Sequence, residues 1–148
     1  MKRIIIGLTA LMSNIMVHAQ MAVDVHTHII LSEYKELLRR HGAELEETFP
    51  LPEWEAENHI SFMDSAGIGC AVLTMPAPQP YYGDGVESAA CIRHVNEVAA
   101  ETKEKHPGRF LFCAALPLPD VDAAIREAIY ALGTLRADGI KLATNSRG

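Results

Sequence analysis

The stretch VDVHTHII at residues 23–30 is the most informative part of the chain. It lies in an apolar, β-branched run over residues 22–30, which predicts a strand. Because successive side chains of a strand point to opposite faces, Asp24, His26 and His28 are expected on one face, with the histidines about 7 Å apart. Two imidazoles at that separation can share one divalent ion when other strands supply further ligands, and a purely structural pair is the alternative. The opposite face would carry Val23, Val25, Thr27 and Ile29.

Strand-like and helix-like segments alternate after this first strand. The helical pattern is clearest over residues 85–105, which stop before Pro107, and after Asp120, which can cap a helix. The alternation predicts an α/β fold in which about four βα units build a parallel sheet. Further strands are expected at 70–75, 110–116 and 139–144, and further helices at 33–40 and 52–66. The last helix has an apolar stripe that is expected to face the sheet, made of Val121, Ile125, Ala128, Ile129, Leu132 and Leu135.

The composition is ordinary for a globular domain and argues against nucleic acid as a partner. The 148 residues are 49% hydrophobic and carry a formal net charge of -6. No basic run follows the first three residues, so the chain lacks the phosphate-neutralising surface that nucleic-acid binding requires. Three cysteines, Cys70, Cys91 and Cys113, are too few for a disulfide framework. Buried free thiols are expected, with one bridge left open as the alternative.

Residues 1–19 differ from the rest of the chain. Two basic residues precede an apolar stretch over residues 4–17, and Ala19 offers a small residue for cleavage. The apolar stretch is interrupted by polar residues and is shorter than the roughly 20 residues that span a bilayer. The pattern predicts a secretory signal peptide over 1–19 and a mature domain, 20–148, that is periplasmic or secreted and not held in the membrane. A buried first strand or a membrane anchor is the alternative.

Several longer stretches together carry a family resemblance. They are VDVHTHII at 23–30, LPEW at 51–54, HISFMDSAGI at 59–68, RHVNEVAAETKEKHPGRF at 93–110 and LPLPDVDAAIREAIYALGTLRADGIKL at 116–142. In these stretches the chain resembles the amidohydrolase-related family, which includes aminocarboxymuconate-semialdehyde decarboxylase and 6-methylsalicylate decarboxylase. The resemblance covers nearly all of the chain after residue 19 and is far more specific than the histidine pair.

The resemblance implies a TIM-like (β/α)8 barrel with a divalent metal at the C-terminal ends of the strands, and we expect this metal to be zinc. His26 and His28 match the first two metal ligands of the family. A further histidine and an aspartate ligand, and the histidine that assists catalysis, would lie beyond Gly148. Since such a barrel needs about 250 residues, we expect this chain to be its N-terminal half, as a fragment or a truncated product. A homodimer is expected of the complete protein.

The implied activity is a metal-dependent decarboxylation of a small aromatic or unsaturated carboxylic acid. Hydrolysis of an amide, ester or lactone uses the same kind of site, with metal-bound hydroxide as the nucleophile, and stays open at this stage. A third hypothesis is that the 148 residues form an inactive fragment. Exposed sheet edges would then favour self-association.

A few other residues invite a functional interpretation. Trp54 and Asn145 are the candidates for contact with substrate. The alternative role is packing for the tryptophan and turn formation for the asparagine. Lys141 comes from the predicted fourth strand, where some amidohydrolases carry a carboxylated lysine, but a mononuclear relative would not use it. Arg109 precedes a strand, so we expect it to have a structural role. The histidines outside the pair, His41, His59, His94 and His106, are expected to be solvated.

Overall fold

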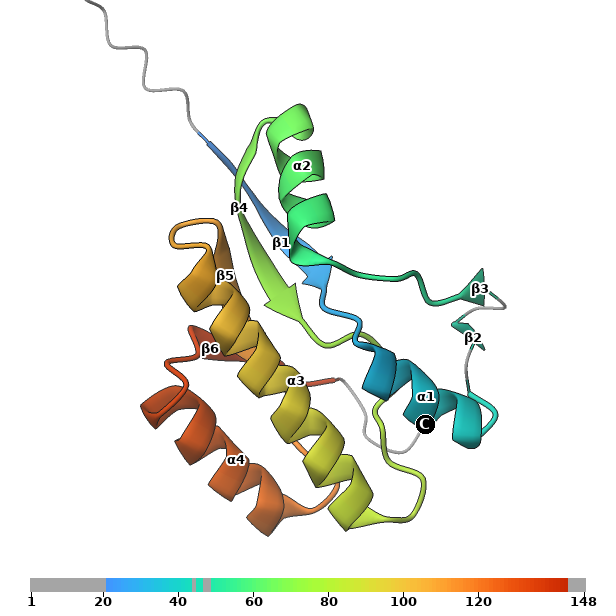
Figure 1. Ribbon diagram of the computed structural model, residues 1–148. Coiled ribbons are helices and arrows are strands. Elements are labelled where there is room, and N and C mark those ends of the chain that lie inside the picture. The colour runs from blue at the N-terminus through green and yellow to red at the C-terminus, as the bar shows by residue number, and fades with distance from the viewer. Residues whose placement is uncertain (1–20, 44, 47–48, 144–148) are drawn as a thin grey trace, which may run out of the picture.

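The computed structural model describes residues 21–43, 45–46 and 49–143, and its centre is a four-stranded parallel sheet (Figure 1). The strands are β1 (Ala22–His28), β4 (Ile68–Thr74), β5 (Phe110–Ala114) and β6 (Gly139–Ile140). They lie side by side in the order β1-β4-β5-β6, and each neighbouring pair is parallel. Each strand begins within two residues of its predicted start, so the predicted α/β architecture is confirmed.

Four helices connect the strands. They are α1 (Ser32–Arg40), α2 (Ala56–Ala66), α3 (Gly85–Lys105) and α4 (Val121–Gly133). Gly67 ends α2 with a φ of 70°, which glycine adopts without strain. The Asp120 carboxylate accepts a hydrogen bond from the Ala123 backbone and caps α4 as predicted. Between α1 and α2 lies a short antiparallel hairpin, β2 (Leu45–Glu46) and β3 (Phe49–Pro50), which the sequence analysis does not predict.

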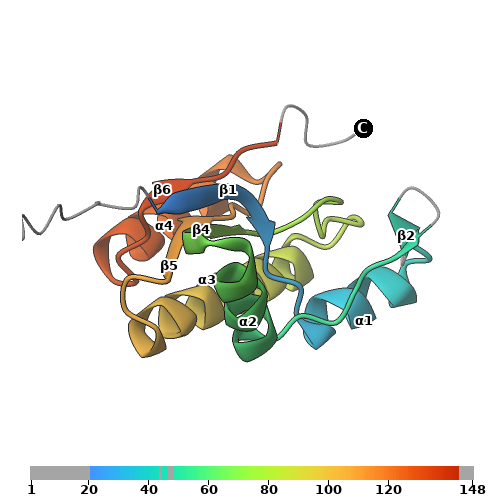
Figure 2. The same cartoon turned by 90° about the horizontal axis from the view of Figure 1, so that it is seen from above.

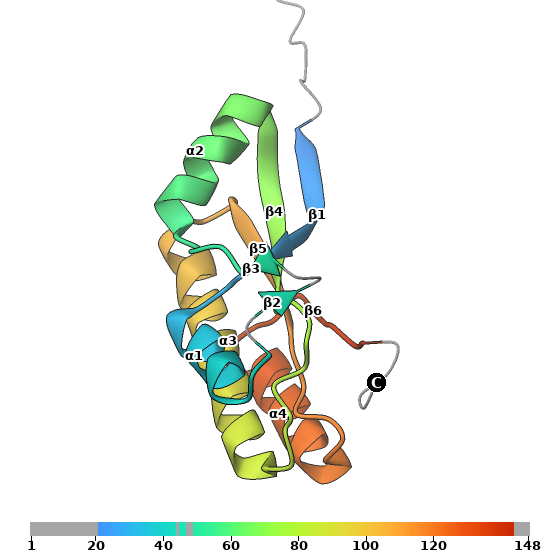
Figure 3. The ribbon, with the colours of Figure 1, turned by 90° about the vertical axis from the view of Figure 1, so that its right-hand side faces the viewer.

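One face of the sheet is covered by helices (Figures 2 and 3). Here α2 contacts β4 and α3 contacts β5. The alternate side chains of β4 and β5 that point to this face are fully buried: Ala71, Leu73, Phe110, Phe112 and Ala114. Among the described residues, these side chains and the helix residues that meet them form the hydrophobic core. We call this side of the sheet the covered face.

The opposite side, which we call the open face, keeps apolar side chains in contact with solvent. Val23 on β1 is 53% exposed and Leu111 on β5 is 37% exposed. The intervening residues of β4, including Cys70, Val72 and Thr74, are half-buried. Continuous apolar runs are typical of strands that are covered on both faces. The sequence therefore predicts a second layer over the open face, and the described residues do not contain one.

The apolar stripe predicted to hold α4 against the sheet is placed differently in the structure. Val121, Ile125, Ile129 and Leu132 are exposed, and of the six predicted residues only Leu135 packs against the core. The buried residues of α4 are Ala124, Glu127 and Ala131. The two small alanines allow close approach to α3, and Glu127 bonds to Arg93 and Asn96 of that helix. A polar network has therefore overridden the hydrophobic periodicity of this helix.

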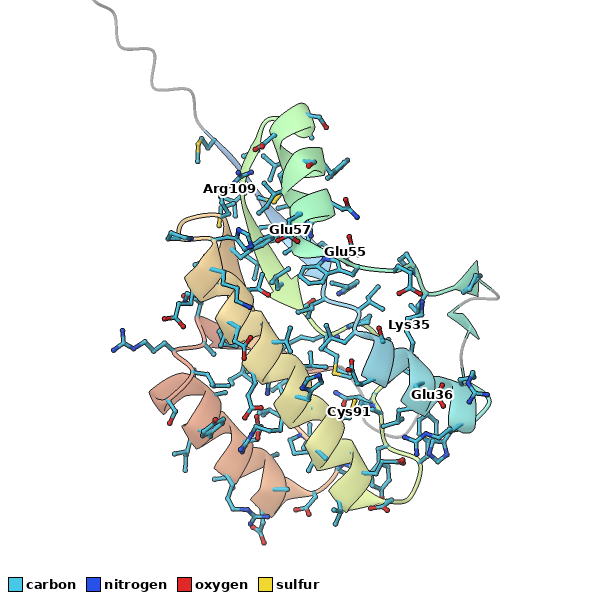
Figure 4. The ribbon with its side chains drawn as sticks, in the orientation of Figure 1. Lys35, Glu36, Glu55, Glu57, Cys91 and Arg109 are labelled. Atoms are coloured by element: carbon cyan, nitrogen blue, oxygen red, sulfur yellow. The ribbon has the colours of Figure 1, made fainter. Side chains whose placement is uncertain are left out.

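The three cysteines are free thiols, and the bridge left open by the sequence is absent. All three are half-buried rather than buried as expected. Cys91 on α3 (Figure 4) packs against the core, and burial, helped by the charges of Glu87 and Glu33, raises the pKa of its thiol to about 11. A thiol with such a pKa is protonated at neutral pH and unreactive.

Within the part of the chain that the structure describes, no helix is both long and apolar enough to cross a bilayer.

Candidate metal centre

His26 and His28 lie at the C-terminal end of β1, and the structure brings their rings together. The ring centroids are 5.2 Å apart, and the rings meet edge to face at an interplanar angle of 68°. His28 is half-buried beside Thr74 of β4, its partner in the parallel register, whereas His26 is exposed. The predicted convergence of the two imidazoles at the C-terminal edge of the sheet is confirmed.

Asp24 does not share their face, contrary to the prediction. It pairs with Ala71, a covered-face residue, whereas His28 pairs with Thr74 on the open face. The register shifts between Asp24 and Thr27, and a bulge of this kind resets the two-residue alternation. The Asp24 carboxylate instead accepts a hydrogen bond from the His26 backbone at 2.9 Å. Strict strand periodicity therefore fails at the residues that carry the site.

The His28 ring is anchored to the neighbouring strand through a side-chain contact. Its Nδ1 atom lies 2.9 Å from the hydroxyl oxygen of Thr74. The same hydroxyl lies 2.9 Å from the Thr27 carbonyl oxygen, to which it donates. Thr27 is itself buried, and its hydroxyl donates to the Val72 carbonyl at 2.8 Å. The imidazole is thus tied to both β1 and β4, and the sequence analysis assigned no role to Thr74.

Lys141 adds a cation to the same edge of the sheet. It follows β6, and its backbone amide donates to the Ala114 carbonyl at the end of β5. Its Nζ atom reaches past β5 and donates to the Met75 carbonyl at 2.7 Å, one residue beyond Thr74. An ammonium group that donates hydrogen bonds favours a nearby anion. The carboxylated state that the sequence analysis considered is not tested by this contact.

The two histidines supply part of a coordination shell. The imidazole nitrogen is a ligand that zinc and other transition metals accept, and a catalytic zinc uses at least three protein ligands. Residues 21–43, 45–46 and 49–143 contain no group of three or more histidine, cysteine, aspartate or glutamate side chains arranged to hold a metal. The donor chemistry of His26 and His28 fits such an ion, and a complete shell needs ligands from outside these residues.

Trp54 packs at the start of α2. It lies against the hydrophobic core, and its indole nitrogen donates a hydrogen bond of 3.0 Å to Nδ1 of His59. This contact supports the packing role that was the alternative in the sequence analysis, and contact with substrate stays a prediction. Asn145, the other predicted substrate residue, and Thr144 beside it lie outside the described residues.

His59 is less solvated than the sequence analysis expected. Its ring lies edge-on to Phe110, with centroids 5.5 Å apart, and it accepts the Trp54 hydrogen bond. Burial lowers the pKa of the imidazole, and the negative charge of Asp24 opposes part of that shift. The indole and imidazole are five residues apart in sequence, a spacing that crosses the start of α2 and gives no periodic signal.

Arg109 lies at the other end of the strands, at the start of β5 (Figure 4). Its guanidinium donates to the Asp64 carboxylate at 2.7 Å and to the Gly69 carbonyl at 3.1 Å. These contacts join the end of α2 to the start of β4, in agreement with the structural role predicted for Arg109.

A hollow of about 420 Å³ lies between α1 and β3. Its lining includes Lys35, Glu36 and Glu53, and Lys35 pairs with Glu53 there. Figure 4 labels the first two on α1. Neither histidine of the pair lines the hollow, and its charged groups neutralise one another. The histidine edge is therefore the better candidate for chemistry.

Comparison with known proteins places the chain in a single family. The amidohydrolase family model matches residues 23–148. The chain is 41% identical to decarboxylase yanB of Aspergillus niger over 132 residues. This alignment covers 85% of this chain and 35% of that protein. The chain is 32% identical over 124 residues to 6-methylsalicylic acid decarboxylase of Penicillium expansum, covering 82% and 38%. The chain thus spans little more than a third of the length of these relatives.

Solved structures share the same fold. A crystal structure of an amidohydrolase II superposes with a TM-score of 0.82 at 29% identity, covering 86% of this chain and 42% of that one. A dihydroxybenzoic acid decarboxylase from Polaromonas, with bound manganese and the inhibitor 2-nitroresorcinol, gives a TM-score of 0.63 at 23% identity, covering 81% and 37%. These neighbours are TIM-barrel amidohydrolases, and the chain corresponds to part of the barrel, as predicted.

Proposed function

The chain belongs to the amidohydrolase family, and on that premise we propose that it contributes to a metal-dependent decarboxylase of a small aromatic carboxylic acid. The observation that carries the proposal is the pair of imidazoles, 5.2 Å apart, at the C-terminal edge of a parallel sheet. That edge is where barrel enzymes of this architecture place their chemistry.

His26 and His28 would hold a divalent ion. We propose zinc, because imidazole is a preferred zinc ligand, with manganese as the rival because the Polaromonas decarboxylase contains it. When bound, such an ion acts as a Lewis acid that polarises an oxygen of the substrate. The remaining ligands and the group that delivers the proton are proposed to come from sequence beyond Gly148.

Lys141 would favour a substrate that carries a carboxylate. Its ammonium lies at the same edge as the histidine pair and is fixed there by the Met75 carbonyl. A positive charge at this edge contributes to the electrostatic attraction of an anion. Loss of CO2 leaves a negative charge on the ring carbon, which must then be protonated, and this chain's described residues do not assign that donor.

Decarboxylation is preferred to hydrolysis because both curated relatives described above carry decarboxylase names. We propose an aromatic substrate because one of them is named 6-methylsalicylic acid decarboxylase.

We further propose that residues 1–19 direct export to the periplasm or beyond the cell, because their composition is that of a signal peptide. We also propose that the complete protein is a homodimer.

The test is CO2 release from 6-methylsalicylate and from a dihydroxybenzoate, with Zn²⁺ or Mn²⁺ supplied to the complete protein that contains this chain. We expect metal-dependent release that is lost in the His26→Ala/His28→Ala variant. The His94→Ala/His106→Ala variant is the matched control, since it also removes two imidazoles, both from outside the site. Metal-dependent cleavage of an aryl ester or lactone without CO2 release would favour the hydrolase. A folded, metal-supplied complete protein without either activity would contradict the proposed enzyme.

A further inference from the structure

We propose that Thr74 is a positioning residue that fixes the proton of His28 on Nδ1 and so presents the Nε2 lone pair to the metal. The proposal rests on the proposed function, because it concerns the ligand state of a metal-binding histidine. It follows from three atoms whose contacts leave one consistent assignment of hydrogens: the Thr27 carbonyl oxygen, the Thr74 hydroxyl and His28 Nδ1.

The first step concerns the Thr74 hydroxyl. Its oxygen lies 2.9 Å from the carbonyl oxygen of Thr27. Two oxygen atoms at that distance attract each other only through a shared hydrogen, and a carbonyl has none to give. The single hydroxyl hydrogen of Thr74 is therefore committed to Thr27.

The second step concerns the imidazole. The Thr74 oxygen, having donated its only hydrogen, meets His28 Nδ1 at 2.9 Å as an acceptor. Nδ1 must then carry the hydrogen. A neutral imidazole has one N–H, so its lone pair is on Nε2, the nitrogen on the far side of the ring. His28 Nδ1–H therefore donates to the Thr74 hydroxyl oxygen, and the Thr74 hydroxyl donates to the Thr27 carbonyl oxygen.

The relay is rigid because it spans two paired strands. Thr27 is buried and bonded to the Val72 carbonyl, and the Ile29 amide donates to the Thr74 carbonyl at 2.9 Å. The threonine side chain also has restricted rotation about χ1, since its Cβ is branched. Metal-binding histidines are oriented in this way by a hydrogen bond to the other ring nitrogen, which raises their affinity for the ion.

The first test reads the tautomer directly in the metal-free chain. Nitrogen-15 spectra distinguish a protonated ring nitrogen from one that carries a lone pair. We expect His28 to be protonated on Nδ1 in the native chain and in Thr74→Ser, which keeps the hydroxyl. Thr74→Val, which keeps the shape and removes the hydroxyl, should lose that preference. Thr102→Val is the control, because the Thr102 hydroxyl bonds within α3 to the Val98 carbonyl.

The result for the native chain alone can overturn the proposal. Protonation on Nε2 in the native chain would contradict the relay, and so would an unchanged tautomer in a folded Thr74→Val chain. Neither outcome depends on turnover, and the first is read on the native chain without any variant.

The second test measures the Zn²⁺ affinity of the complete protein and of its Thr74 variants by calorimetry, because His26 and His28 supply only part of the shell. Loss of an outer-shell partner weakens metal binding by about 10- to 100-fold, and we expect a change of that size for Thr74→Val. Thr74→Ser should restore the native affinity. Equal affinity in the native and Thr74→Val proteins would overturn the positioning role. A complete protein with the expected tautomer that binds no Zn²⁺ in any form would support the relay and contradict the proposed metal function.

Discussion

The two faces of the sheet have similar apolar side chains but different surroundings. On the covered face Phe112 is fully buried beneath the helices, whereas its neighbour Leu111, on the open face, is 37% exposed. The side chains of His28 and Thr74 belong to the open face at its C-terminal edge. The covered face therefore stabilises the fold, and the open face carries the groups that can meet a ligand.

Charged groups follow the same division. Between α3 and α4, the carboxylate of Glu127 is 5% exposed and accepts hydrogen bonds from Arg93 and Asn96. At the histidine edge, Lys141 is held by a backbone carbonyl. A buried charge needs a partner to be tolerated, so the arrangement around Glu127 is structural, whereas the Lys141 contact places a positive charge at the histidine edge.

The largest expected effect compares the adjacent residues Phe112 and Leu111. Phe112→Ala should lower the free energy of unfolding by about 3–5 kcal/mol, because it empties a packed site. Leu111→Ala should cost less than about 1 kcal/mol, because that side chain already meets solvent. Urea denaturation of both variants gives the comparison. Similar losses would mean that the open face is covered in solution, for example by a second copy of the chain.

A smaller effect is expected from the polar network under the helices. The Asn96 side chain bonds to both the amide and the carbonyl of Ala115 and to Glu127. Asn96→Ala should lower the free energy of unfolding by about 2–3 kcal/mol, since buried polar groups lose their partners. Asn58→Ala is the control and should cost under about 0.5 kcal/mol, because the Asn58 side chain is exposed and bonds to the exposed Glu55 carboxylate. A neutral result for Asn96→Ala would show that the network does not stabilise the covered side.

The smallest effect tests whether the covered side also responds to pH. Burial lowers the pKa of His59 below its ordinary value near 6.5. Below that pH the unfolded chain binds a proton that the folded chain resists, so stability should fall as the pH is lowered from 7 to 5. His59→Gln keeps an acceptor for Trp54 and removes the titration, so its stability should fall less over that range. Equal pH slopes of the unfolding free energy in the two chains would contradict this role of His59.

Local signals in the sequence predict most of the fold. The bounds of α3 are those predicted, because Pro107 follows its end and the apolar spacing before it is regular. The histidine pair was found because a strand ends there. The orientation of α4 was missed, because a buried Glu127 reverses the face that hydrophobic periodicity favours. Predicting that reversal needs knowledge of Arg93 and Asn96 as spatial neighbours, which the sequence does not contain.

The site was predicted less completely than the fold. The bulge before Thr27 puts Asp24 and the histidines on different faces of the sheet, and no residue type in the segment predicts this bulge. Thr74 was overlooked because its role depends on the register between β1 and β4. The sequence around Trp54 is compatible with substrate contact or with packing, and the structure provides a packing partner in His59.

Metal content is the measurement that tests the central claim most directly. Elemental analysis of the complete protein that contains this chain, after equilibration with Zn²⁺ and removal of free ion, would be compared with its His26→Ala/His28→Ala and His94→Ala/His106→Ala variants. We predict bound metal in the native protein and in the second variant, and its loss in the first. Bound metal that persists without His26 and His28, or a folded native protein that retains none, would contradict the proposed metal centre.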